Sequence, residues 1–227
     1  MKKFVVILAV FLCSLAKETY ATPITFDDID ASFGDVSLDG ISPYQELTWT
    51  NFYVYTAFAG FDGFNNGVVS GTNGAYSGGE TFGSGIAPVV GTITSDSLFN
   101  LESLYLGSGY YDGLQVTIEG KRAGSTIAST TVNVDTTGAV FTNLNFLGLN
   151  EIDIYAVATA STTDPYFCGS FNCTQFTIDD LTLSPSSYTP PPSLVSEPST
   201  LPLFGLAAIT LGMVWRKHCK ACAKATT

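Results

Sequence analysis

The 227 residues carry 20 Asp and Glu, nine Lys and Arg, and one His, for a formal net charge of −11. The central part is more acidic still: residues 22–195 hold 18 acidic residues and only two basic ones, Lys121 and Arg122. Such a segment repels a phosphate backbone, which excludes nucleic acid as a partner, whereas neutral ligands and divalent cations stay open.

The first 21 residues have the pattern of a secretory signal peptide. Lys2 and Lys3 form a short basic region, residues 4–16 form an apolar helix, and small residues follow at the spacing that signal peptidases cleave. Cleavage after Ala21 is predicted. The protein is therefore expected to be exported.

Residues 22–184 are predicted to form one all-β domain. Short stretches of alternating apolar and polar residues recur between Gly, Asn and Asp, and none has a sustained helical period. The predicted strands cover residues 24–29, 47–55, 92–95, 98–106, 114–120, 127–134, 140–146, 152–158 and 176–183. This number of strands without βαβ alternation favours a β-sandwich, and a jelly roll resembling a carbohydrate-binding module is the preferred form.

Aromatic residues are the first candidates for ligand contact. A strand over 47–55 places Trp49, Tyr53 and Tyr55 on one face, where core packing is the expected fate of Trp49. Residues 60–85, rich in Gly, Asn and Ser, are interpreted as long loops. Tyr110 and Tyr111 lie beside a turn and are predicted as weak sites for a glycan.

The two ends of this domain repeat a pair of aspartates. Asp27 and Asp28 follow the first strand, and Asp179 and Asp180 lie in the last. If the two strands are neighbours, the four carboxylates cluster, and Ca²⁺ is the ion whose oxygen coordination suits such a cluster. The resemblance to carbohydrate-binding modules, many of which hold a structural calcium, also points to calcium. The alternative, outward-facing aspartates at strand ends, stays open.

The remaining chemistry of the domain is sparse. The one histidine, His218, lies near the C-terminus, so the domain has no Ser-His or Cys-His pair. No catalytic residue is predicted, and a non-enzymatic protein is expected. Cys168 and Cys173 are predicted to form a disulfide in the exported protein.

The C-terminal part has three segments in order. Residues 185–195 are a proline-rich linker, residues 201–215 form an apolar run, and basic residues follow it. The apolar run is expected to enter a membrane as a helix, with the basic end kept on the cytoplasmic side.

Residues 196–227 resemble a PEP-CTERM sorting signal, a tail that is also called the ice-binding protein C-terminal domain. Ser196, Glu197, Pro198, Ser199 and Thr200 correspond to its motif, although Ser196 stands where the first proline is usual. The resemblance implies recognition and cleavage by an exosortase in a bacterium that makes exopolysaccharide. The protein would be held in the inner membrane transiently, and would then reach the cell surface or the extracellular matrix.

These features together predict an exported matrix or surface protein that binds extracellular polysaccharide without catalysis. Two alternatives stay open: a structural or adhesive protein that self-associates, and a glycoside hydrolase that uses a pair of carboxylates.

Overall fold

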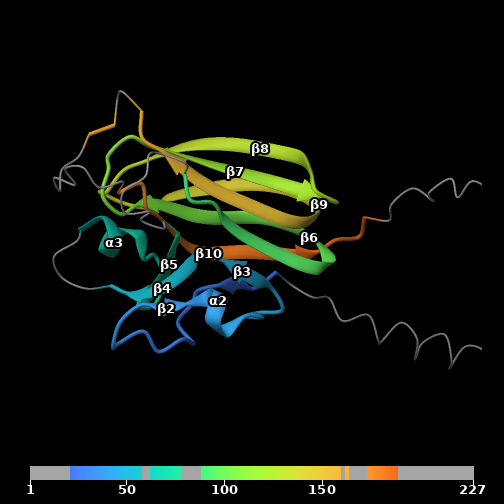
Figure 1. The fold of residues 1–227 in the computed structure, drawn as a ribbon, viewed down its shortest axis with the longest axis horizontal. Coiled ribbons are helices and arrows are strands. Elements are labelled where there is room, and N and C mark those ends of the chain that lie inside the picture. Colours follow the sequence, from blue (N-terminus) through green and yellow to red (C-terminus); the bar gives the residue numbers. More distant parts are fainter. Residues whose placement is uncertain (1–20, 58–61, 78–87, 160–161, 164–172, 189–227) are drawn as a thin grey trace, which may run out of the picture. The chain divides into compact units, whose positions relative to one another are not determined.

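In the computed structural model, the domain consists of antiparallel β-strands in two layers (Figure 1). The structure describes residues 21–57, 62–77, 88–159, 162–163 and 173–188. The strands are β1 (Pro23–Ile24), β2 (Val36–Ser37), β3 (Thr48–Thr50), β4 (Phe52–Thr56), β5 (Asn73–Ser77), β6 (Gly91–Ser108), β7 (Leu114–Arg122), β8 (Ser125–Val134), β9 (Val140–Val157) and β10 (Phe176–Pro185). Two short helices, α2 (Leu38–Ile41) and α3 (Asp62–Gly67), lie between strands. The all-β prediction is confirmed.

Two long strands, β6 and β9, belong to both layers. The first residues of β6 pair with β3 and with residues 151–154 of β9, whereas residues 99–108 pair with β10. Register shifts between Thr94 and Ser103 bend the strand where it passes from one layer to the other. The prediction of separate strands on either side of residues 96–97, and again of 147–151, was wrong because β6 and β9 each continue through these residues, with register shifts in their pairing.

The core lies between the layers and consists of the inward rows of the strands. Leu114, Val116 and Ile118, whose alternation predicts one face of a strand, are all fully buried. They belong to one apolar cluster with Ile154 of β9 and Ile178 of β10. This burial is the main stabilising contribution to the fold.

The segment around Trp49 departs from its prediction. Asn51 has a φ of 62°, which interrupts the alternation and ends β3 before β4 begins. As a result Phe52 and not Tyr53 faces Trp49, with ring centroids 5.3 Å apart. Trp49 is 1% exposed, so its placement in the core is confirmed, but its predicted shared face with Tyr53 and Tyr55 was wrong.

The prediction of long loops over residues 60–85 was also wrong in part. It missed α3 and β5, which pairs with both β4 and β10. Gly74 and Ala75 gave β5 a weak strand signal. Residues 78–87 lie outside the described part of the chain, as do residues 1–20 and 189–227 with the predicted leader and tail. Among the described residues, no helix has the length and apolar character needed to cross a membrane.

Candidate functional site

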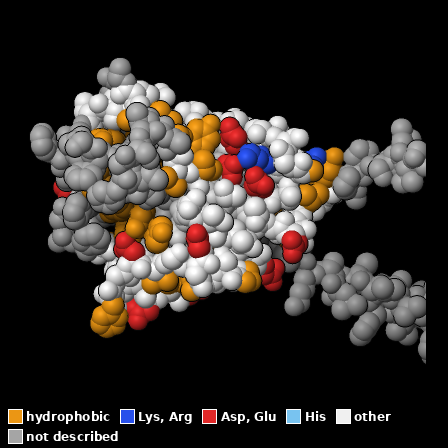
Figure 2. Space-filling model, viewed as in Figure 1, with side chains coloured by type: hydrophobic (Ala, Val, Ile, Leu, Met, Phe, Trp, Pro, Cys, Tyr) orange, Lys and Arg blue, Asp and Glu red, His pale blue; other side chains and the backbone are white. Residues whose placement is uncertain are grey.

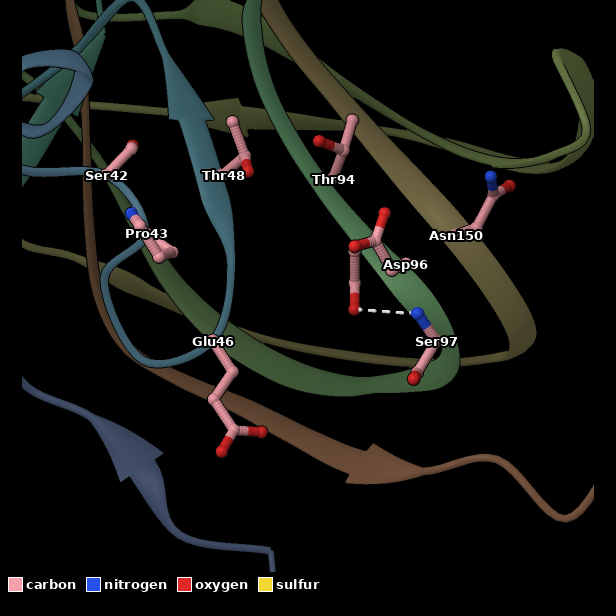
Figure 3. A pocket seen from close by; sticks show the side chains of 9 residues that line it. Ser42, Pro43, Glu46, Thr48, Thr94, Asp96, Ser97 and Asn150 are labelled. Carbon is pink, nitrogen blue, oxygen red and sulfur yellow. Dashed lines mark hydrogen bonds between the residues drawn. The ribbon is translucent and has the colours of Figure 1, made fainter.

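A pocket of about 730 Å³ opens beside the bend of β6 (Figure 3). Its other wall is the turn of residues 44–47 that leads into β3, here called the β3 hairpin. Its lining comes from the hairpin, from β6 and from β9: Ser42, Pro43, Glu46, Thr48, Thr94, Ser95, Asp96, Ser97 and Asn150. The size is typical of sites that take small ligands. All of these residues except Pro43 carry a hydroxyl, amide or carboxylate group.

A two-residue turn places Glu46 at the edge of the pocket. Tyr44 and Leu47 exchange backbone hydrogen bonds of 2.9 and 3.1 Å, which closes the hairpin. Gln45 and Glu46 both take positive φ, 53° and 63°, as a turn of type I′ requires. Non-glycine residues pay a conformational cost there. Figure 3 shows the Glu46 side chain extending from this turn.

Hydrogen bonds from side chains in and next to the hairpin hold it in place. The Tyr44 hydroxyl donates to Asp28 at 2.6 Å, and the Trp49 indole N–H donates to the Tyr44 carbonyl at 3.0 Å. Ser42 accepts a hydrogen bond from the Trp49 backbone N–H at 3.0 Å and donates one to the Leu38 carbonyl at 2.8 Å. The pocket wall is therefore built on the aromatic core and is preorganised.

The opposite wall is the bend of β6. The Ser97 backbone N–H donates to the Ser95 hydroxyl at 3.2 Å, and the exposed Asp96 lies between them (Figure 3). Asn150 on β9 uses its carbonyl oxygen to accept from the Ala123 N–H at 3.0 Å. That bond orients the Asn150 amide group at the rim.

The pocket has negative charge and no basic residue. Lys121 is bound by Glu151 at 3.1 Å and by Asp153. Arg122 donates to the Leu147 carbonyl at 2.9 Å and lies 3.7 Å from the centroid of the Tyr188 ring. In Figure 2 one blue side chain lies among acidic ones, and the other lies beside hydrophobic side chains. Both cations of the domain are thus engaged elsewhere, and the pocket disfavours anionic ligands.

Three of the four predicted aspartates bind one segment, residues 69–73. Asp27 accepts hydrogen bonds from the backbone N–H groups of Thr72 at 2.7 Å and Asn73 at 3.1 Å. Asp179 accepts from Val69 at 2.7 Å and Ser70 at 2.9 Å. The first and last strands are neighbours as expected, since β1 pairs with β10. The two ends of the domain therefore hold the same loop.

The two carboxylates respond in opposite ways to this contact. Burial acts to raise the pKa of Asp27, but hydrogen bonds from Thr72 and Asn73 outweigh it, and the pKa is lowered. Asp179 is fully buried, and burial raises its pKa to about 6 although backbone N–H groups of Ser70, Val69 and Asp180 act to lower it.

The other two aspartates differ. Asp180 accepts a hydrogen bond from the Ser70 hydroxyl at 2.6 Å, and so joins the same loop. Asp28 instead binds Tyr44 and supports the hairpin. Among the described residues, no group of three or more His, Cys, Asp or Glu is placed to hold a metal ion. The neighbours of Asp27 and Asp179 are mainly N–H donors, not oxygen ligands. Calcium binding stays a prediction of the sequence.

The remaining predicted residues divide into two sets. Tyr110 and Tyr111 are both partly exposed, but Tyr110 packs on Phe64 at 5.2 Å and Tyr111 packs against the core. Cys173 is buried, whereas Cys168 lies outside the described residues, so the disulfide stays a prediction. The motif residues 196–200 also lie outside them.

Sequence reasoning missed the polar pocket. Its walls come from residues some 50 positions apart in the chain, which the fold brings together. The one signal was the polar run Thr94-Ser95-Asp96-Ser97, of which residues 94–95 were predicted as the end of a strand and residues 96–97 as a connection.

The sequence matches no protein-family model and no curated protein. Three solved structures align over most of their own length. The Stig cyclase Fisc from Fischerella sp. TAU, in complex with an indole compound, has 14% identity over 76% of this chain and 93% of its own, with a TM-score of 0.38. TmCBM61 in complex with β-1,4-galactotriose has 8% identity over 65% and 94%, with a TM-score of 0.35. CBM32-3 from a family 31 glycoside hydrolase of Clostridium perfringens has 16% identity over 62% and 92%, with a TM-score of 0.37. At these scores the alignments identify neither a family nor a function.

Proposed function

We propose that the domain binds neutral glycans without catalysis, through the pocket between the β3 hairpin and the bend of β6. The observation that carries this proposal is the lining itself: hydroxyl, amide and carboxylate groups surround a pocket of about 730 Å³ that contains no Lys, Arg or His. Sugar hydroxyls both donate and accept hydrogen bonds, so carboxylates and hydroxyls together satisfy them. A charge-assisted bond to a carboxylate is stronger than a neutral one.

The hairpin wall of the pocket is held rigidly by the core, which favours ligand binding. Hydrogen bonds of 2.8–3.0 Å that involve Ser42, Tyr44 and Trp49 fix the hairpin, so binding costs little conformational entropy there.

Removal of one negative charge from the pocket is expected to weaken binding. We predict that Glu46→Gln and Asp96→Asn each lower affinity for a neutral oligosaccharide about tenfold, because a charge-assisted hydrogen bond is lost. The oligosaccharide is first selected from an array of neutral glycans on the wild-type protein, and affinities are then measured by titration calorimetry. Asp62→Asn, which removes an acid from α3 outside the pocket, is the control and is expected to leave the affinity unchanged. Equal affinities for all four proteins would show that the ligand binds elsewhere.

A second candidate function rests on the same two carboxylates. Glu46 and Asp96 line one pocket, and a pair of carboxylates is the machinery of most glycoside hydrolases. Release of new reducing ends from the selected oligosaccharide by the wild-type protein, lost in Asp96→Asn, would favour the hydrolase over the binding module.

The segments on either side of the domain support a proposal about where the protein is localised. A leader over residues 1–21, an apolar run over 201–215 and the motif at 196–200 together favour export, transient anchoring and processing by an exosortase. The domain would then act at the cell surface or in an exopolysaccharide matrix, where neutral glycans are found.

Deletion of residues 201–227 is expected to move the protein from the membrane fraction to the soluble exported fraction, because the apolar run is lost. The measurement is immunoblotting of cell fractions. Deletion of linker residues 189–193 is the control: it leaves the apolar run and the motif at 196–200 intact, so this variant is expected to fractionate as the wild type does. A deletion of residues 201–227 that fractionates like the wild type contradicts the anchoring proposal.

A further inference from the structure

One edge of the β-structure is long and unpaired in the described part of the chain. The strand order ends with β2 on one side and β8 on the other, and β8 pairs only with β7. β2 has two residues and offers little to a new strand, whereas β8 has ten. In Figure 1, β8 lies at the upper border of its layer.

The edge formed by β8 lacks the features that normally prevent strands from joining. Natural edge strands are protected by charged residues, proline, bulges or shortness. Residues 125–134 read Ser-Thr-Ile-Ala-Ser-Thr-Thr-Val-Asn-Val, with no charged residue, no proline and no glycine. One register shift, beside Lys121 of β7, affects only the first part of the strand. Residues 128–134 therefore present a regular edge.

We propose that β8 pairs antiparallel with β8 of a second copy of this chain, about a two-fold axis at Thr130. In this register Ser129 of one copy lies opposite Thr131 of the other, and Ala128 lies opposite Val132. Cross-strand pairs of Ser and Thr, and of apolar residues, are favourable. The hydroxyl oxygens of Thr117 on β7 and Thr131 on β8 are already 2.9 Å apart. The proposed register extends this row of hydroxyl groups into the second copy.

Self-complementarity identifies the second copy as the occupant. In the dimer, each exposed row lies beside the exposed row of the other copy; this row is Ile127, Ser129, Thr131 and Asn133. On the opposite face, each half-buried row lies beside the half-buried row of the other copy; this row is Ala128, Thr130 and Val132. An uncharged edge leaves no charge unpaired when two copies meet. The rest of the domain is strongly acidic, so two copies repel at a distance and the association is expected to strengthen as salt screens that repulsion.

Charge reversal across the pairing tests the proposal on the full chain, purified in detergent. Sedimentation velocity is measured at protein concentrations up to about 1 mM, since a strand-edge interface is small and weak. The wild type is expected to dimerise. Ser129→Lys with Thr131→Lys, and Ser129→Glu with Thr131→Glu, each place like charges opposite one another and are expected to lower the association at least tenfold. A mixture of the lysine and glutamate variants is expected to form a heterodimer.

Asn143→Lys with Asn145→Lys is the matched control, because it adds the same charges at the same spacing on β9 and is expected to leave the dimer unchanged. Circular dichroism verifies that every variant is folded. A monomeric wild type, a dimer insensitive to the β8 substitutions, or a mixture that fails to associate would each overturn the proposal.

Discussion

Replacement of Trp49 by alanine is expected to lower the free energy of unfolding by about 3–5 kcal/mol, the range for removing a buried aromatic side chain. The indole is 1% exposed and makes edge-to-face contacts with Phe26 at 5.7 Å and Phe52 at 5.3 Å. Its N–H also satisfies the Tyr44 carbonyl, so truncation leaves both a cavity and an unpaired acceptor. Urea unfolding, followed by circular dichroism, measures the loss.

Two controls separate packing from the hydrogen bond and from aromatic content. Trp49→Phe keeps a ring but removes the N–H, and a smaller loss of about 1–2 kcal/mol is expected. Phe33→Ala removes an aromatic side chain that is 99% exposed and should change stability by less than about 0.5 kcal/mol. A Trp49→Ala variant as stable as Phe33→Ala would contradict the placement of the hairpin on the core.

Stability is expected to depend on pH through Asp179. Burial raises the pKa of this carboxyl from 3.8 to about 6, so the folded state binds the proton more readily than the unfolded chain. The contribution of Asp179 to stability is therefore greatest below pH 4, and is lost as the pH rises through 6. About 3 kcal/mol is expected to separate its two limits, at about 1.4 kcal/mol for each pKa unit. The free energy of unfolding is measured in urea at pH values from 4 to 7.5.

The Asp179→Asn variant isolates the pH-dependent contribution of Asp179, because the asparagine side chain does not titrate. As the pH rises from 4 to 7, the free energy of unfolding of the wild type is expected to fall relative to that of the variant. Asp30→Asn, at an exposed carboxyl that accepts hydrogen bonds from Ser32, is the control and should show no change of this kind between pH 5 and 7. A difference that stays constant with pH would show that the Asp179 carboxyl is not held in a buried site.

Sequence reasoning predicted the class of fold because alternation in a half-buried strand is a local property. Leu114, Val116 and Ile118 show the pattern without knowledge of any neighbour. Strand boundaries were less predictable. The positive φ of Asn51 and the register shifts of β6 interrupt the alternation at single positions, which a pattern of apolar and polar residues does not locate.

The candidate site shows the same division. The neighbouring positions of the first and last strands were expected, but the binding of residues 69–73 by both Asp27 and Asp179 was not. No motif predicted the pocket. Glu46 and Asp96 are 50 positions apart, and they come to line one pocket only because β3 pairs with β6. The contact of Asp28 with Tyr44 was not predicted, because it depends on the path of the hairpin.

The most direct test of glycan binding in the pocket is the mapping of backbone amide chemical shifts during titration of the wild-type protein with the selected neutral oligosaccharide. The account predicts that the largest changes occur at Thr48, at residues 94–97 and at Asn150, and that Asp96→Asn reduces all of them. Changes concentrated away from these residues, or none at millimolar oligosaccharide, would contradict it.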